Sequence, residues 1–233
     1  MTEKIKIAHV NIETPLYISN EYVQLLILES PTEFYKAVND LNGQFEGGAG
    51  AFVFSRCGEI VSAEKYGMMV CDLFHFDLND KKVLNLLYKQ LERNALEGEY
   101  LPAFYAMNGK TVEFLEKLFY SVPFALTYDE PQPLEVFKAV GIKFEKVYES
   151  LEEKIICYIN AMIELKKCEF FIFVNLKNVL NDEKLELLYR HCQAEKVGLL
   201  LIEHYKVRPL LACEKAVIIT EDLCEILENY EEL

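Results

Sequence analysis

Gly109-Lys110-Thr111 match the end of a phosphate-binding loop, the first chemistry to test in this sequence. The full pattern needs a glycine five positions before Gly109, where Phe104 stands, and the residues between them are not rich in glycine. Such a segment cannot present a ring of backbone amides to phosphates. We therefore expect a loop or a helix cap here. We also expect a mobile loop at residues 47–50, which are rich in glycine.

Other catalytic and metal-binding patterns are missing. The four His show no metal-ligand spacing, the seven Cys include no Cys-x-x-Cys pair, and no Gly-x-Ser-x-Gly elbow occurs. Glu203 and His204 follow a predicted strand, where α/β proteins often place functional groups. With no catalytic partner visible for either, we expect two residues at the end of that strand whose hydrogen bonds are satisfied.

A cationic stripe lies on a predicted helix over residues 79–93. At about 100° per residue, Lys82, Lys89 and Arg93 fall within roughly 40° of one another, opposite a leucine stripe. Such a stripe could follow a phosphate backbone. The alternative is an ordinary solvated helix face.

Carboxylates gather at residues 128–135. Asp129, Glu130 and Glu135 offer hard oxygen ligands in a loop and a helix start, which calcium favours, although their spacing is not that of an EF-hand. The alternative is a helix N-terminus, whose dipole attracts carboxylates.

The overall charge bears on the choice of partner. The 233 residues carry 24 Lys and Arg against 38 Asp and Glu, a net charge of −14. Taken alone, this argues against nucleic acid, unless cations are segregated on one face or a metal neutralises carboxylates. Free thiols, no visible signal peptide and no apolar run long enough for a membrane span predict a cytoplasmic protein.

The elements that must position these residues follow from hydrophobic patterning. Short apolar runs predict buried parallel strands, the capping pattern Ser150–Glu153 opens a helix to Lys167, and Asn181-Asp182-Glu183 opens another. An alternating stretch predicts an edge strand at 5–12, and a small hairpin is expected at 51–61. The acidic tail after Thr220 is interpreted as a solvated helix. The predicted buried strands are Val23–Leu28, Phe170–Val174, Gly198–Ile202 and Ala216–Ile219.

The strand–helix–strand order of 170–202 indicates a βαβ unit. Residues 76–165 have an almost wholly helical pattern. We therefore predict an α/β fold with a discontinuous head, residues 1–75 and 166–233, and an inserted helical leg, residues 76–165.

Five collinear stretches resemble the small adaptation protein of type II-A CRISPR systems, the Csn family of DNA-end-binding rings. Their order and spacing fit almost the whole chain. The resemblance is poor at 42–66 and loose at 98–125. The stretches are Leu25–Glu29, Val70–Leu78, Tyr128–Glu130 with Leu134–Lys143, Phe171–Asn175 and Gly198–Glu203.

This resemblance implies an NTPase-like head with a mainly parallel sheet, lacking a P-loop, and an inserted all-helical leg. It also implies a homotetrameric ring that binds calcium between subunits and threads double-stranded DNA ends through a basic hole. The expected partners are the CRISPR integrase proteins and the RNA-guided effector nuclease, and no catalytic activity is expected.

Carried over residue by residue, the calcium ligands of the family fall on Asp129 and Glu135, with Glu130 adjacent. Ala125 replaces a further family Asp. The basic hole would receive Lys138 and Lys143, together with the stripe of Lys82, Lys89 and Arg93.

Two other functions stay open at this stage. One is an interaction scaffold of the adaptation complex without direct DNA binding, suggested by the net charge and by Ala125. The other is an unusual NTPase or a metal-dependent nuclease, with Asp72, Asp129, Glu135 and Glu203 as candidate carboxylates.

Overall fold

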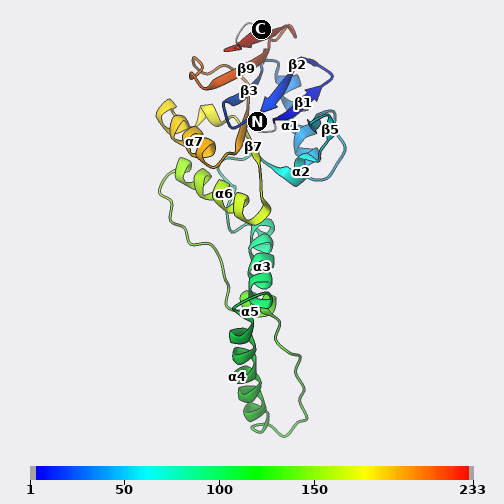
Figure 1. Cartoon of the computed structure of the whole chain (residues 1–233), viewed down its shortest axis with the longest axis vertical. Coiled ribbons are helices and arrows are strands. Elements are labelled where there is room, and N and C mark those ends of the chain that lie inside the picture. The colour runs from blue at the N-terminus through cyan, green and yellow to red at the C-terminus, as the bar shows by residue number, and fades with distance from the viewer. Residues whose placement is uncertain (1–3, 231–233) are drawn as a thin grey trace. The chain divides into compact units, whose positions relative to one another are not determined.

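The computed structural model describes residues 4–230. The chain forms two compact units, one of residues 1–76 and 147–233 and one of residues 77–146 (Figure 1). We call them the head unit and the 77–146 unit. The predicted boundaries were 75/76 and 165/166, so the predicted and observed units differ mainly in the helix α6 (Leu151–Lys166), which belongs to the head unit. Ile155, Ile159 and Met162 of α6 are fully buried, which ties this helix to the head unit.

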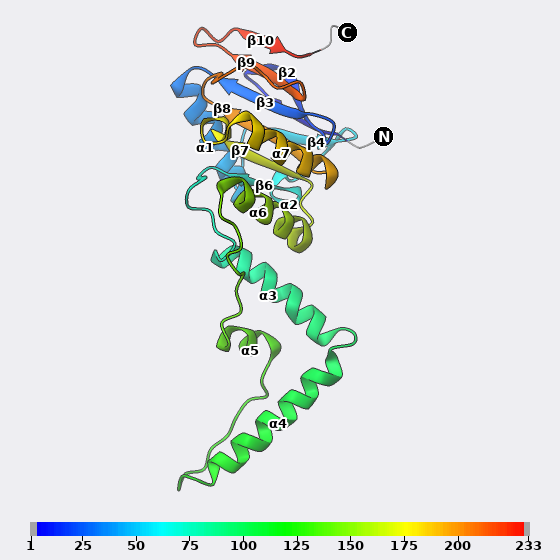
Figure 2. The ribbon, with the colours of Figure 1, turned by 90° about the vertical axis from the view of Figure 1, so that its left-hand side faces the viewer.

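The head unit is α/β and is built on a six-stranded, mostly parallel sheet. Its strand order is β10-β9-β3-β8-β7-β6, and Figure 2 shows the strands in this sequence. All neighbouring pairs are parallel except β9 and β10. The strands are β3 (Val23–Leu28), β6 (Gly67–Val70), β7 (Phe170–Val174), β8 (Gly198–Glu203), β9 (Glu214–Ile219) and β10 (Glu225–Glu228).

The central strands are apolar throughout because both faces of the sheet are covered. Every residue of β3, β7 and β8 is buried. Side chains that alternate along each strand serve opposite faces. On one face, Tyr158 of α6 packs its ring against Phe171, beside α7 (Asp182–Ala194). The four predicted buried strands are confirmed, and so is the parallel strand–helix–strand unit of β7, α7 and β8.

The other face packs against α1 (Pro31–Phe45), α2 (Ala63–Tyr66) and a second, antiparallel sheet. That sheet has the order β2-β1-β4-β5. Its close approach leaves no room for a side chain at Gly198, where a Cβ atom would overlap Ile18. The strands are β1 (Ile5–His9), β2 (Ile12–Ile18), β4 (Val53–Arg56) and β5 (Glu59–Ile60).

Helix starts follow the predicted chemistry. Ser150 Oγ accepts a hydrogen bond from Glu153 N at 3.3 Å at the start of α6. Asn181 Oδ1 accepts one from Lys184 N at 3.0 Å at the start of α7. Each cap satisfies a backbone donor that the helix itself leaves free.

Three local predictions are wrong. The tail after Thr220 is not a helix, because β10 pairs with β9 as an antiparallel edge strand. The predicted edge strand at 5–12 is a β1–β2 hairpin, in which His9 pairs with Ile12 across a turn. Gly109-Lys110-Thr111 lie inside a helix, α4 (Leu101–Phe119), and form neither a loop nor a cap.

The 77–146 unit contains α3 (Lys81–Leu96), α4 and α5 (Pro133–Ala139). Tyr88 of α3 donates a hydrogen bond to Ile142 O at 2.8 Å. The side-chain amide of Asn79 donates to Phe144 O and accepts from Phe144 N. The chain after α4 folds back along it, since Asn108 Nδ2 donates to Pro131 O at 3.0 Å. No helix among residues 4–230 is long and apolar enough to cross a bilayer.

A buried ionic cluster links the segment that follows β7 to the amino end of β9. Lys177 Nζ donates to both Glu214 oxygens, at 2.7 and 2.6 Å, and Tyr189 OH donates to Glu214 Oε1 at 2.7 Å. Lys177 and Glu214 are 3% and 0% exposed. The Lys177–Glu214 pair and Tyr189 therefore join the short helix η1 (Leu176–Asn178), β9 and α7 at a site closed to solvent. Loss of one of the two charges would leave the other buried and unpaired.

Glu203 belongs to the same region but lacks a cation of its own. It is fully buried and accepts a hydrogen bond from Lys177 N at 2.9 Å. Burial raises the pKa of Glu203 to about 7, against the lowering effect of the Lys177 backbone and charge. The folded protein thus prefers the neutral carboxyl. This preference stabilises the fold fully below the ordinary pKa of 4.5 and is lost as the pH rises through about 7.

We expect Glu203→Gln to remove this pH dependence. A shift of this size corresponds to roughly 3 kcal/mol, so the variant should gain stability over the wild type between pH 5 and 8. Urea unfolding across that range measures the difference. As a control, Glu214→Gln should destabilise at every pH, since it leaves Lys177 unpaired. Parallel pH profiles for the wild type and Glu203→Gln would contradict the assignment.

Candidate nucleic-acid interface

The predicted cationic stripe is exposed on α3. Asp80 caps this helix by accepting from Lys82 N at 2.8 Å, and Val83 is its buried residue, which fixes the helix face that packs inward. Lys82, Lys89 and Arg93 are all exposed. The capping residue Asp80 therefore fixes where the helix begins. Because the leucine stripe of the helix packs inward, the three cations face the solvent.

The other two candidate cations belong to the same unit. Lys138 lies in the last turn of α5, and Lys143 follows that helix; both are exposed. The Tyr88–Ile142 hydrogen bond ties the chain between these two lysines to α3. The structure thus brings all five predicted DNA-binding residues into residues 77–146.

These cations are largely free of carboxylates. Among residues 4–230, no ion pair or hydrogen bond engages the ammonium groups of Lys82, Lys89, Lys138 or Lys143, whereas Arg93 donates to Gln90 Oε1. The 77–146 unit carries nine Lys and Arg against eleven Asp and Glu, a net −2 of the −14 for the chain. Most of the excess negative charge therefore lies in the head unit.

Lys110 is a cation that the sequence analysis overlooked. It lies on α4, is exposed, and has no ion pair among the described residues. Its sequence context, Gly109-Lys110-Thr111, had suggested only a phosphate-binding loop. Because Lys110 lies on a helix of the same unit as the other candidate cations, it is also a candidate for contact with phosphate.

The three candidate calcium ligands do not assemble into a site within one chain. Asp129 and Glu130 are exposed between α4 and α5, and Glu135 Oε2 accepts from Gln132 N at 3.3 Å as part of a capping box. The helix-terminus interpretation is thus confirmed for Glu135. Residues 4–230 contain no group of three or more His, Cys, Asp or Glu side chains placed to hold a metal. The oxygen donors suit calcium chemically, but one chain leaves the coordination incomplete.

Two of the four carboxylates considered for catalysis, Asp72 and Glu203, have structural partners in the head unit. Asp72 accepts from Phe74 N and His75 N, at 2.9 and 3.0 Å, and its second oxygen meets His75 Nδ1 at 2.7 Å. Those backbone hydrogen bonds lower the pKa of Asp72. Glu203 is enclosed beside Lys177. His204 Nδ1 lies 2.9 Å from Leu28 O, so Glu203 and His204 bond to different neighbours rather than to each other.

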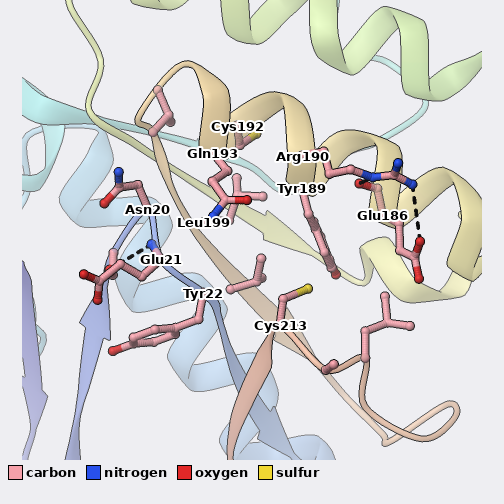
Figure 3. Close-up of a pocket in the computed structure, with 15 residues that line it drawn as sticks. Asn20, Glu21, Tyr22, Glu186, Tyr189, Arg190, Cys192, Gln193, Leu199 and Cys213 are labelled. Carbon is pink, nitrogen blue, oxygen red and sulfur yellow. Dashed lines mark hydrogen bonds and ion pairs between the residues drawn. The ribbon is translucent and has the colours of Figure 1, made fainter.

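One cavity of about 240 Å³ opens at the amino ends of β3, β8 and β9, against α7. Figure 3 shows Tyr22, Tyr189 and Cys213 around it, with Arg190 directed to Glu186 at 3.3 Å. Asn20 Oδ1 is buried at its edge without a hydrogen-bond partner in the described structure. The lining of this cavity combines polar and apolar side chains, and its charged side chains are already paired. Such a lining does not suit a phosphate backbone.

Comparisons with known proteins agree with the sequence resemblance. The family model described as CRISPR-associated protein (Cas_Csn2) matches residues 44–223. A CRISPR-associated protein Csn2 of Enterococcus faecalis is 23% identical over 141 residues, 60% of this chain and 64% of that protein. Another Csn2, of Streptococcus agalactiae, is 25% identical over 137 residues, 58% of this chain and 62% of that protein. The matched segment thus spans less than two thirds of either relative.

Two solved structures are similar at lower identity. One is the ADP conformation of an ATP-binding cassette of an ABC transporter, 13% identical, with a TM-score of 0.48 over 98% of this chain and 92% of that one. The other is a nucleotide-free ATP-binding cassette, 15% identical, with a TM-score of 0.46 over 96% and 91%. Both scores are below 0.5, and nothing about the chain rests on them.

The family model covers well over half of the chain, and both curated relatives carry the same name. The resemblance found in the sequence is confirmed. The chain belongs to the Csn2 family of CRISPR-associated proteins.

Proposed function

We propose that this protein binds the ends of double-stranded DNA without sequence preference or catalysis, as a homotetrameric ring that supports CRISPR spacer acquisition in the cytoplasm. One observation carries the DNA part of this proposal. Four exposed lysines without carboxylate partners share one unit with Arg93, on a chain that is otherwise strongly acidic. Family membership supports the CRISPR role.

Segregated charge would let an acidic protein bind DNA. Phosphate contacts release condensed counterions, so affinity depends on the cations at the contact rather than on net charge. A ring that gathers several copies of these cations around a hole multiplies them there, while carboxylates outside the hole repel DNA from the rest of the surface.

The apolar surface of the 77–146 unit supports self-association. The 19-residue helix α4 has no buried residue. Exposed apolar patches of this extent are typical of interfaces, since water around them costs free energy. We assign them to contacts with other copies of the chain. The most exposed large hydrophobic residues on α4 and the segment after it are Tyr105 at 62%, Phe114 at 63%, Tyr120 at 91% and Phe124 at 71%.

Calcium would join this assembly through Asp129, Glu130 and Glu135. Because one chain leaves the coordination incomplete, the remaining ligands would come from a second copy. Ala125, in the same exposed segment, supplies no side-chain oxygen. The ion would neutralise carboxylates that otherwise repel both one another and DNA.

The integrase proteins and the RNA-guided effector nuclease are the proposed protein partners, on the basis of family membership. A scaffold that contacts these proteins without binding DNA is the second candidate function. The exposed apolar side chains of α4 favour it equally well, because they would serve any protein partner. Binding to DNA separates the two functions.

Charge reversal at the interface should abolish DNA binding. We expect Lys138→Glu with Lys143→Glu to weaken binding to linear DNA strongly. Neutralising Lys82, Lys89 and Arg93 to Gln should make the dependence of log K on log salt shallower by about 0.9 per lost phosphate contact. Fluorescence anisotropy over a salt series measures both effects.

A matched control uses exposed lysines of the head unit. Lys36→Glu with Lys167→Glu makes the same change in net charge. Within residues 4–230, the ammonium groups of these lysines pair only with Glu33 and Glu164, respectively. This control should retain near-wild-type affinity. Equal losses in the two double variants would mean that net charge alone governs binding, and the proposed interface would be wrong.

A ring that must be threaded should distinguish DNA forms. We expect tight gel-shift binding to a linear fragment and little binding to the same sequence as a closed circle, in calcium. Phe114→Glu should lower the mass seen by light scattering and remove this preference, whereas Leu187→Glu, at an equally apolar exposed site on α7, should not. Equal binding to line and circle would rule out threading, and no binding to either would favour the scaffold.

Chelation tests the ion. If copies share calcium, EDTA should lower the Tm of the wild type by the loss of ligand stabilisation, and added calcium should restore it. Asp129→Asn with Glu135→Gln should melt like the chelated wild type and should not respond to EDTA. A wild-type melting curve that is unchanged by EDTA would argue against the site while leaving DNA binding open.

A further inference from the structure

A cavity of about 510 Å³ lies over the carboxyl ends of β3 and β9 in the head unit. Its floor includes Leu28 and Ile219, the last residues of these strands, which lie opposite each other in the parallel ladder. One wall comes from α1 and another from the β1–β2 turn with Phe52. The volume falls within the range of roughly 300–1,000 Å³ typical of small-molecule sites.

The position of this cavity follows from the topology. After β3 the chain enters α1 and reaches β6 at one edge of the sheet, whereas β9 continues into β10 at the other edge. The two connections leave the β3–β9 pair in opposite directions and open a crevice between them. Open α/β sheets bind ligands in such a crevice, at the carboxyl ends of the strands.

The chemistry at the crevice does not suit phosphate. Pro31 begins α1 directly after Ser30 and lacks an N–H group, so the helix start presents fewer donors than an anion site needs. Glu33, in the first helical turn, adds negative charge where a phosphate would lie. The nearby Lys36 is already paired with Glu33 at 2.8 Å.

The cavity carries a net negative charge next to aromatic rings. Asp40 uses Oδ2 to accept from Ala51 N at 2.8 Å, and no partner for its Oδ1 is found in the described structure. The rings of His9 and Phe52 lie 4.4 Å apart between centroids. Burial lowers the pKa of His9 despite Asp40 and Glu33, so this ring adds no positive charge at neutral pH. The charged groups of the cavity are thus two carboxylates, Glu33 and Asp40, and one cation, Lys36, which leaves a net negative charge.

We propose that this cavity binds a small organic cation, an amine or amidine on an aromatic body. Asp40 receives the charged group through Oδ1, with Glu33 adding to the negative potential. The rings of Phe52 and His9 pack against the aromatic body, and aromatic faces also attract cations. Leu28 and Ile219 close the apolar floor.

The proposal is tested with tyramine and benzamidine as probes, against phenylacetate and ADP. Chemical-shift mapping by NMR on the full-length protein should show both cations binding, with shifts at Phe52, Leu28 and Ile219. The two anions should leave these signals unchanged. Asp40→Asn keeps the acceptor for Ala51 N but removes the charge, and should weaken cation binding about tenfold, the effect of one lost charge-assisted contact.

A second variant and a control exclude simple misfolding. Ala51→Phe fills the exposed rim of the cavity and should block both cations while the Tm stays near the wild-type value. Glu164→Gln changes an exposed carboxylate of α6 and should leave binding unchanged. Failure of either cation to bind, equal binding of phenylacetate or ADP, or undiminished binding by Asp40→Asn would each overturn the proposal. None of these outcomes depends on DNA binding.

Discussion

Burial of the parallel sheet on both faces is the constraint on which the rest of the head unit depends. A strand such as β3, with no exposed residue, is stable only if its hydrogen bonds are completed by β8 and β9 and both faces are dry. This requirement dictates the crossovers that bring α6 and α7 to one face, and α1 with the small sheet to the other. It also places chain ends and polar groups at the strand termini, where the Lys177–Glu214 pair and both cavities lie.

The same constraint explains why much of the fold could be predicted. Runs such as Phe170–Val174 are too short and too apolar for anything but buried strands, and the caps at Ser150 and Asn181 act locally. The acidic tail was misassigned because its partner, β9, is a tertiary feature. Edge strands need only half of their residues to be apolar, so Glu225–Glu228 carried a weak strand signal. Its Glu225 accepts backbone hydrogen bonds from Glu13 and Thr14, a contact across 211 residues or more that no local pattern reveals.

Some residues of the candidate site could be predicted from the sequence, but their arrangement in space could not. Helical periodicity alone placed Lys82, Lys89 and Arg93 on one exposed stripe, because their spacing and their leucine partners lie on one helix. Lys138 and Lys143 required the family resemblance, since neither belongs to a long periodic segment. Lys110 was not among the predicted DNA-binding residues, because its motif, Gly109-Lys110-Thr111, was considered only as a nucleotide phosphate-binding loop. The β3–β9 cavity was missed because its walls come from four segments far apart in the chain.

The two units differ in how much of their apolar surface they bury within the chain. The head unit satisfies its strands internally, with a continuous core on each face of the sheet. The helices of the 77–146 unit cannot do so, because three helices enclose too little volume to bury their apolar faces. The proposed self-association would cover α4, which has no buried residue within the chain. In such an assembly, the cations on α3 and after α5 are repeated by symmetry. Self-association through α4 would then also concentrate the positive potential. A monomer of net charge −14 could not gather several copies of these cations.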